Sequence, residues 1–298
     1  LLWTTLRDAV LRLDPGLLKA GFLFLVIGYG TKAGLAPMHN WLPDAHSQAP
    51  APVSAIFSGF MLNAALYCIL RCLPLAEAAT GHTGWGRSIL VVFGILSVLV
   101  AAVFIVAQRD VKRMLAYSSV EHLGIIALGV GLGGLGAVAA LFHMVNHSLC
   151  KSVSFCCAGR LGQIYGTQDV RRMTRMLRVA PVWGTGLVTG LLTLIGVAPM
   201  AIFLSEFLIL KTAVDAASYG VAALFLIGAG VVFVGVLRHV VAMAWEPLTE
   251  NVSAPKTHGL EGALVFGPLA VLLLLGVWIP RPFLNFLTQA ARVLGGAS

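Results

Sequence analysis

Charged residues are scarce in this chain of 298 residues. Asp, Glu, Lys and Arg together make up 11% of the sequence, whereas hydrophobic residues make up 58% and the mean hydropathy is +0.91. Soluble globular domains carry roughly 25% charged residues, so the composition predicts an integral membrane protein. In a membrane protein, the net charge of +8 indicates which loops face the cytoplasm and which contact anionic lipid, and it does not indicate binding to nucleic acid.

Cysteine is also sparse and follows no pattern typical of a disulfide or a metal site. The five cysteines lie in apolar segments, their number is odd, and no two are spaced as Cys-x-x-Cys. We therefore predict small core residues. They are Cys68, Cys72, Cys150, Cys156 and Cys157. No charged-then-apolar signal sequence precedes the first apolar segment, and we expect the chain to be a portion of a longer protein.

What the chain does have is a series of eight apolar segments of roughly spanning length. Residues 1–19 alternate apolar and charged residues and predict an interfacial helix that ends at Pro15-Gly16. Residues 20–280 predict a transmembrane domain and residues 281–298 a C-terminal tail. The fold class is therefore an all-α polytopic membrane bundle. The predicted spans lie near 20–38, 53–73, 87–107, 112–131, 135–159, 180–214, 220–245 and 260–279.

Two of these segments carry the same interruption. Residues 34–42, Gly-Leu-Ala-Pro-Met-His-Asn-Trp-Leu, match residues 196–204, Gly-Val-Ala-Pro-Met-Ala-Ile-Phe-Leu, at five of nine positions. Proline removes a backbone donor and breaks a helix. Paired broken helices in two halves of a membrane protein indicate an ion-handling site, with chance similarity of short strings as the alternative. The predicted breaks centre on Gly34 and Pro37 and on Gly196 and Pro199.

Three titratable residues recur every fourth position within one apolar segment. His143, His147 and Lys151 should stack on one face of a helix, with about 6 Å of rise between neighbours. Imidazole titrates near pH 7 and a buried lysine can change charge, so we interpret this ladder as a proton relay. A structural hydrogen-bond network and a metal or haem site are the alternatives, since histidines at i and i+4 can bind zinc.

Other ionisable residues lie inside or beside predicted spans, where charge is costly and usually functional. Lys32 should lie deep in the first span, with a snorkelling lysine as the alternative. Glu121 and His122 lie ten residues into the fourth span and could pair with the ladder. Glu206 follows the second break and precedes Lys211 on the same helix, as a pathway member or as half of a local ion pair.

The loops predict the orientation of the chain. Eight crossings place both termini on one side, and the denser Lys and Arg clusters in the short loops at 109–113 and 160–178 are assigned to the cytoplasm. Both termini then lie outside. Asp44 is predicted to lie in a loop and to cap the helix that starts near Pro52.

Four stretches together resemble a known family. They are residues 31–46, residues 51–55 (Ala-Pro-Val-Ser-Ala), residues 110–119 (Asp-Val-Lys-Arg-Met-Leu-Ala-Tyr-Ser-Ser) and the helix of the His-His-Lys ladder. They resemble the antiporter-like proton-pumping subunits found in respiratory complex I, in Mrp-type cation/proton antiporters and in membrane-bound hydrogenases. Glu121-His122 and Ser205-Glu-Phe207 look most similar to the hydrogenase 4 component F branch.

The resemblance implies fourteen core helices arranged as two inverted five-helix repeats, of which this chain matches the last eight. Lys32 matches the lysine of the first broken helix and Glu206 the charged residue of the second. The glutamate that partners the lysine belongs to an earlier helix. Many relatives carry a histidine shortly after Pro-Val-Ser-Ala, whereas this chain has Phe57-Ser58.

The function implied is proton translocation driven by redox chemistry in partner subunits. The expected partners are other membrane subunits of a hydrogenase or complex I-like assembly, peripheral redox subunits and the lipid bilayer of the cell inner membrane. No flavin, iron–sulfur or nickel motif is present in the sequence, so we expect no cofactor and no metal in this chain. A sodium/proton antiporter subunit and a haem- or metal-carrying membrane redox protein are the alternatives.

Overall fold

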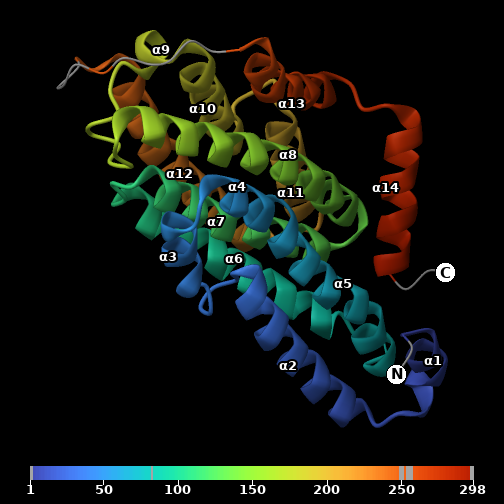
Figure 1. Cartoon of the computed structure of the whole chain (residues 1–298). Helices are drawn as coiled ribbons and strands as arrows, with labels where there is room; N and C mark the ends of the chain where they lie inside the picture. The colour runs from blue at the N-terminus through green and yellow to red at the C-terminus, as the bar shows by residue number, and fades with distance from the viewer. Residues whose placement is uncertain (1–2, 82, 248–251, 253–257, 296–298) are drawn as a thin grey trace.

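The computed structural model describes residues 3–81, 83–247, 252 and 258–295. Within these ranges the protein is a bundle of α-helices without a β-strand (Figure 1). Six helical stretches are long and apolar enough to cross a membrane. They are 15–33, 51–79, 85–106, 111–132, 219–245 and 259–277. The predicted all-α membrane bundle is confirmed, with boundaries shifted by a few residues.

The first nineteen residues do not form one interfacial helix. Helix α1 (Trp3–Ala9) runs into a 3-10 turn (Val10–Arg12), and α2 (Pro15–Ala33) begins soon afterwards. The carboxylate of Asp14 caps α2 by accepting a hydrogen bond from the backbone N–H of Leu17 at 2.8 Å. The ring of a proline fixes its φ at a helical value, so proline is favoured at the first position of a helix. Pro15-Gly16 therefore begins α2, and the prediction that it ends an interfacial helix was wrong.

Both predicted helix breaks are present. Helix α2 ends at Gly34, which has φ +80°, and the short helix α3 (Trp41–Gln48) continues after a cis Ala36–Pro37 bond. The backbone N–H of Ala36 donates to Ser97 Oγ at 2.9 Å, which supplies one backbone group of the break with a partner inside the protein. Non-helical backbone at membrane depth requires such partners.

The second break repeats this geometry. Helix α10 (Pro181–Leu194) is followed by Gly196 at φ +71° and a cis Ala198–Pro199 bond, after which α11 (Ala201–Asp215) begins. The predicted span 180–214 is therefore two short helices, neither of which is long enough to cross a membrane by itself.

The remaining helices complete the bundle. Helix α4 (Ala51–Ile56) continues through a π-helical segment (Phe57–Met61) into α5 (Leu62–Ala79). The others are α6 (Trp85–Val106), α7 (Val111–Leu132), α8 (Gly134–Tyr165), α9 (Met176–Val179), α12 (Tyr219–Trp245), α13 (Gly259–Val277) and α14 (Arg281–Leu294). Helix α8 spans 32 residues, and it falls outside the apolar set because its polar residues lower its hydropathy.

The predicted C-terminal tail is mostly helical. Helix α14 buries Leu287, Ala291 and Leu294, and it packs against α8 and α5. Phe286 on the same helix remains exposed. Figure 1 shows α14 along one side of the bundle, with its end near α1. Its one-sided apolar pattern is typical of a helix that lies against protein or at a membrane surface.

Helix α7 occupies the centre of the described fold. All but two of its residues are buried, because α6 and α8 pack along it and α3 and α11 also contact it. A polar residue on α7 therefore faces other helices and not lipid. This arrangement lets an ionisable group lie within an otherwise apolar bundle.

A glycine holds α13 against the second break, and we predict that it tolerates no side chain. A methyl group added at Gly276 would meet the carbonyl oxygen of Pro199 and lie 2.7 Å from the carbonyl carbon of Met200. Overpacking of this kind costs about 1–3 kcal/mol, so Gly276→Ala should lower the melting temperature by roughly 5 °C. Gly267→Ala on the same helix meets nothing within 4 Å and should not lower it. Equal melting temperatures in detergent would contradict this packing.

Candidate functional site

The three members of the ladder point into the protein. His143, His147 and Lys151 are each completely buried on one face of α8, as is Asn146 beside them. The predicted stacking on a single helix face is therefore confirmed. A face of this kind avoids lipid, where these groups would be unsatisfied.

Lys151 reaches across to the centre of α7. Its Nζ donates to the backbone carbonyl of Leu115 at 2.7 Å and to the hydroxyl of Ser118. These partners are neutral acceptors, so the described residues solvate the ammonium without an ion pair. The carboxylate of Glu121, further along α7, interacts with Lys151 electrostatically. Lys151 is thus held where it can lose or gain a proton without breaking a salt bridge.

A pair of histidines connects α7 to α8 and α11. His122 Nδ1 lies 2.9 Å from His143 Nε2, and His143 Nδ1 lies 2.8 Å from Ser205 Oγ. The Ser205 hydroxyl is also 2.8 Å from the carbonyl of Ile202. When the hydroxyl donates to that carbonyl it accepts from His143, and His143 then accepts from His122. The tautomers are inferred here from the hydrogen-bond network.

His122 also joins the two halves of the ladder. Its ring centroid lies 5.1 Å from that of His143 and 5.2 Å from that of His147. Nε2 of His122 and Nε2 of His147 are buried without a hydrogen-bond partner among the described residues. In the network inferred above, Nε2 of His122 carries a lone pair and can accept a proton. The Asn63 amide nitrogen lies 3.5 Å from His147 Nδ1, so the ring proton of His147 is on Nε2, where it can be donated. The order along the site is therefore Lys151 and His147 on α8, His122 on α7, His143 on α8 and Ser205 on α11.

Two acidic residues flank this line. Glu121 is 3% exposed, and one carboxylate oxygen has no partner among the described residues. Glu206 on α11 places its carboxylate against Gly196 of the second break and within 4.8 Å of ring nitrogens of His122 and His143. The two carboxylates also interact electrostatically. The sequence-predicted candidates Glu121, His122 and Glu206 thus lie together with the ladder.

Two basic candidates lie elsewhere. Lys211 is exposed and forms an i, i+4 ion pair with Asp215 at 2.5 Å. The alternative of an ion pair between Lys211 and Glu206 was wrong, because Asp215 lies one helical turn from Lys211 and Glu206 faces inward. Lys32 lies in the last turn of α2, next to the first break, and its side chain is on the surface of the described bundle; its depth in the span stays a prediction. It stands apart from the ladder because α2 packs mainly on α5.

Asp44 does not lie in a loop. It belongs to the first turn of α3, and its carboxylate pairs with Arg113 at 3.0 Å on the protein surface. The residue before α4 is Pro50, and no side chain caps that helix. The prediction of a cap was wrong because the chain re-enters a helix at Trp41, soon after the break, and turns the Asp44 carboxylate toward α7.

Neutral polar residues were missed by the sequence reasoning. Ser58 Oγ, in the π-helical segment, lies 2.8 Å from Ser119 Oγ, and Asn63 Nδ2 lies 3.5 Å from His147 Nδ1 and donates to Ser148 Oγ at 2.8 Å. The second span therefore contributes hydroxyl and amide groups to the site. Ser, Thr and Asn inside apolar spans were the available signal.

A metal ion is the other occupant that these residues could hold. Ligand atoms of His122, His143 and Glu206 lie within 4.8 Å of one another. The two facing ring nitrogens are 2.9 Å apart, whereas two nitrogens on one tetrahedral zinc are about 3.3 Å apart. The spacing is that of a shared proton, and the donor set fits a hydrogen-bonded relay better than a preformed zinc site.

Comparison with known sequences places this arrangement in a family. Residues 10–232 match the family described as "NADH:quinone oxidoreductase/Mrp antiporter, TM". The chain belongs to this family. It is 46% identical over 212 residues to the hydrogenase-4 component F homolog of Methylacidiphilum infernorum, which covers 71% of this chain and 44% of that relative. It is 31% identical over 258 residues to formate hydrogenlyase subunit 3 of Escherichia coli, covering 81% of this chain and 42% of that protein.

Solved structures of two other membrane complexes contain a chain with the same fold. A chain of the membrane-bound sulfane sulfur reductase, an archaeal respiratory membrane complex, superposes with a TM-score of 0.88 at 28% identity, covering 98% of this chain and 59% of that one. A chain of the Mrp complex from Dietzia sp. DQ12-45-1b gives 0.83 at 19% identity, over 94% and 61%. The protein is therefore a multi-pass membrane protein with the antiporter-like fold. It spans less than half the length of the curated relatives named above.

Proposed function

We propose that the chain conducts protons within a membrane complex, along the line from Lys151 through His147, His122 and His143 to Ser205 and Glu206. The observation that carries this proposal is the hydrogen-bonded pair of imidazoles, His122 and His143, with a hydroxyl on its far side at 2.8 Å. Each imidazole can accept a proton on one nitrogen and release one from the other. A line of such groups passes charge without moving a heavy atom far.

The proposed step starts at the free Nε2 of His122. A proton that arrives there makes the ring cationic, and His122 then releases its Nδ1 proton to His143 Nε2. His143 in turn releases its Nδ1 proton to Ser205 Oγ, and the Ser205 hydroxyl passes its own proton on to the carboxylate of Glu206. Lys151 and His147 precede His122 on the line and supply this proton, and the carboxylate of Glu121 nearby favours protonation of the histidines.

We propose protons and not sodium as the ion. Sodium, a hard cation like calcium and magnesium, is bound by oxygen ligands, whereas the central positions of the line are ring nitrogens that hydrogen-bond to one another. Against the redox-protein alternative, both nitrogens of His143 have hydrogen-bond partners, which leaves no coordination position on this ring for a haem iron. We propose that the chain carries no cofactor and that electron transfer takes place in peripheral subunits.

The relatives are described as components of hydrogenases, of formate hydrogenlyase and of respiratory complexes. We propose that this chain likewise assembles with other membrane subunits in the cell inner membrane, and that its orientation places both chain ends outside. We expect no nucleic acid among its partners.

The complete complex in proteoliposomes tests the proposed ion. With a pH-sensitive dye inside the vesicles, the driving redox reaction should produce a pH change of the same size with and without sodium. A protonophore should collapse the signal in both cases. If the pH change requires sodium, or grows several-fold when sodium is added, the chain serves sodium/proton exchange and the nitrogen-lined pathway is not its ion path.

A further inference from the structure

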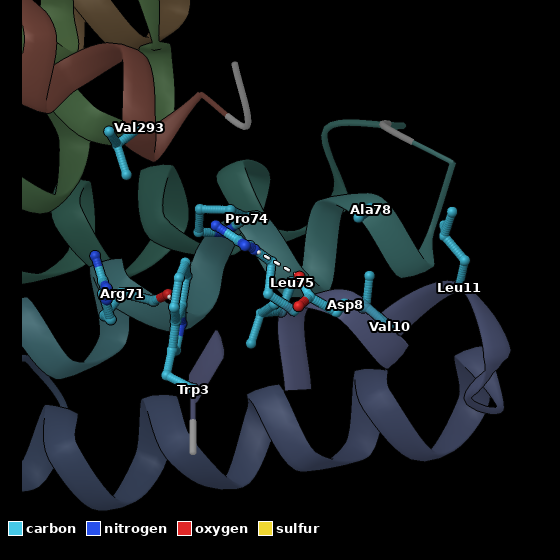
Figure 2. A pocket seen from close by; sticks show the side chains of 10 residues that line it. Trp3, Asp8, Val10, Leu11, Arg71, Pro74, Leu75, Ala78 and Val293 are labelled. Carbon is cyan, nitrogen blue, oxygen red and sulfur yellow. Dashed lines mark hydrogen bonds and ion pairs between the residues drawn. The ribbon is translucent and has the colours of Figure 1, made fainter. Parts of the chain in front are cut away.

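The first two helical turns of the chain form a pocket with the end of α5 and α14. The pocket encloses about 590 Å³, within the range of about 300–1,000 Å³ typical of small-molecule sites. Figure 2 shows Trp3 beside Arg71, with Pro74, Leu75 and Ala78 further along α5 and Val293 of α14 above them. Its walls are mostly apolar, and its polar groups come from two arginines, one tryptophan and one aspartate.

Arg71 is already positioned at this pocket. Its guanidinium lies over the ring of Trp3, 3.8 Å from the centroid, and its backbone carbonyl accepts a hydrogen bond from Trp3 Nε1 at 3.0 Å. Among the described residues, no carboxylate or carbonyl accepts a hydrogen bond from this guanidinium. The guanidinium group of Arg71 is therefore held by stacking while its N–H donors remain available. The planar arrangement of these donors matches the spacing of two oxygens of a phosphate group.

A second arginine adds to the positive charge and one acid opposes it. Arg7 lies 5.6 Å from the centroid of the same Trp3 ring. Arg7 Nε also donates to the carboxylate of Asp8 at 3.0 Å, with both side chains at least half exposed. An exposed pair of this kind is weak, so Arg7 can exchange this partner for another anion. The pocket keeps one net positive charge.

The position of the pocket matches the edge of a bilayer. Continuous helix runs from Ala51 to beyond Arg71, and twenty residues of helix span about 30 Å, the thickness of the hydrocarbon core. Trp85 lies at the start of α6 at the same end of the bundle, with Lys19 Nζ 5.7 Å from its ring centroid. Tryptophans and cations at this level are typical of the membrane–water interface.

We propose that this pocket binds an anionic phospholipid. The phosphodiester contacts the guanidinium groups of Arg71 and Arg7, and an acyl chain lies along Leu75, Pro74 and Val293. The apolar wall distinguishes this ligand from free phosphate, which would leave the wall in water. The two cations distinguish it from a zwitterionic lipid, whose ammonium group they would repel.

The test uses the complete protein, purified in a neutral detergent. It is titrated with phosphatidylglycerol that carries a fluorophore on one acyl chain, and in parallel with phosphatidylcholine labelled in the same way. We expect the wild type to prefer phosphatidylglycerol. A basic residue near the surface contributes about five-fold to such binding, so Arg71→Gln and Arg7→Gln should each weaken it by about that factor, and raised salt should weaken it further.

Two variants keep the test decisive. Arg12→Gln removes a positive charge from an exposed residue of the same segment that does not line the pocket, and it should leave the binding unchanged. Asp8→Asn removes the opposing charge and should strengthen the binding several-fold, a gain that a misfolded protein would not show. Equal binding of the two lipids, loss in Arg12→Gln as large as in Arg71→Gln, or full competition by millimolar inorganic phosphate would each overturn the proposal.

Discussion

Replacing Lys151 by methionine is expected to abolish proton transfer while the protein still assembles. Methionine keeps most of the apolar stem and removes the ammonium group, which donates to Leu115 and Ser118 inside the bundle. The loss of a positioned proton donor costs roughly 100-fold or more. The measurement is the initial rate of internal pH change in proteoliposomes, with assembly checked by size-exclusion chromatography.

Two further lysine variants define what Lys151 does. Lys151→Arg keeps the positive charge but scarcely deprotonates, so it should fail almost as badly if Lys151 must release a proton, and work if it supplies only a fixed field. Lys211→Met makes the same change at an exposed residue paired with Asp215, and its rate should stay within about two-fold of the wild type because exposed pairs contribute little. A near-normal rate in Lys151→Met would show that the ladder is a structural hydrogen-bond network.

The ladder could be predicted because a helix has a fixed period. His143, His147 and Lys151 at intervals of four must share a face, and an apolar segment leaves that face only a protein interior to point into. The two broken helices were predictable for a related reason. Gly and Pro repeat in the same order in both halves, and the structure places a left-handed glycine, Gly34 or Gly196, at each break.

Contacts between helices could not be predicted in the same way. The sequence does not show that His122 of α7 lies between two histidines of α8, since that depends on how two helices are rotated about their axes. The same limit affected the charged residues. Lys211 lies in an apolar helix but is exposed and pairs with Asp215, which the sequence pattern does not show.

Local chemistry explains the errors at the start of the chain. Pro15-Gly16 could end one helix or begin the next. The Asp14 side chain accepts a hydrogen bond from the backbone N–H of Leu17, which makes Asp14 the N-cap of a helix that begins at Pro15. Asp44 follows Trp-Leu-Pro, a sequence that favours a loop, but the proline occupies the first turn of α3, where its missing N–H has no cost. A proline at a helix start was interpreted as a helix end in the first case and as part of a loop in the second.

Glu206 connects the two features on which the proposal rests, the second break and the pair of histidines. Its carboxylate lies against Gly196, where a side chain would collide with it, and it is near ring nitrogens of both His122 and His143. Its neighbour in sequence, Ser205, accepts the hydrogen bond of His143. In the proposed pathway, a proton that leaves His143 therefore has a carboxylate acceptor beside an interrupted helix, where backbone groups freed by the break can accept hydrogen bonds.

Glu206→Gln should therefore block proton transfer by roughly 100-fold or more, because the amide keeps the shape and polarity of the side chain but cannot hold a transferred proton. The control is Asp215→Asn on the same helix, an acid-to-amide change at an exposed residue, which should leave the rate within about two-fold of the wild type. Glu206→Asp keeps an acid on a stem shorter by one methylene group, so it should recover part of the rate. Full activity in Glu206→Gln would move the exit of the pathway away from the second break, whereas equal losses in Gln and Asp would mean that Glu206 supports the break and carries no proton.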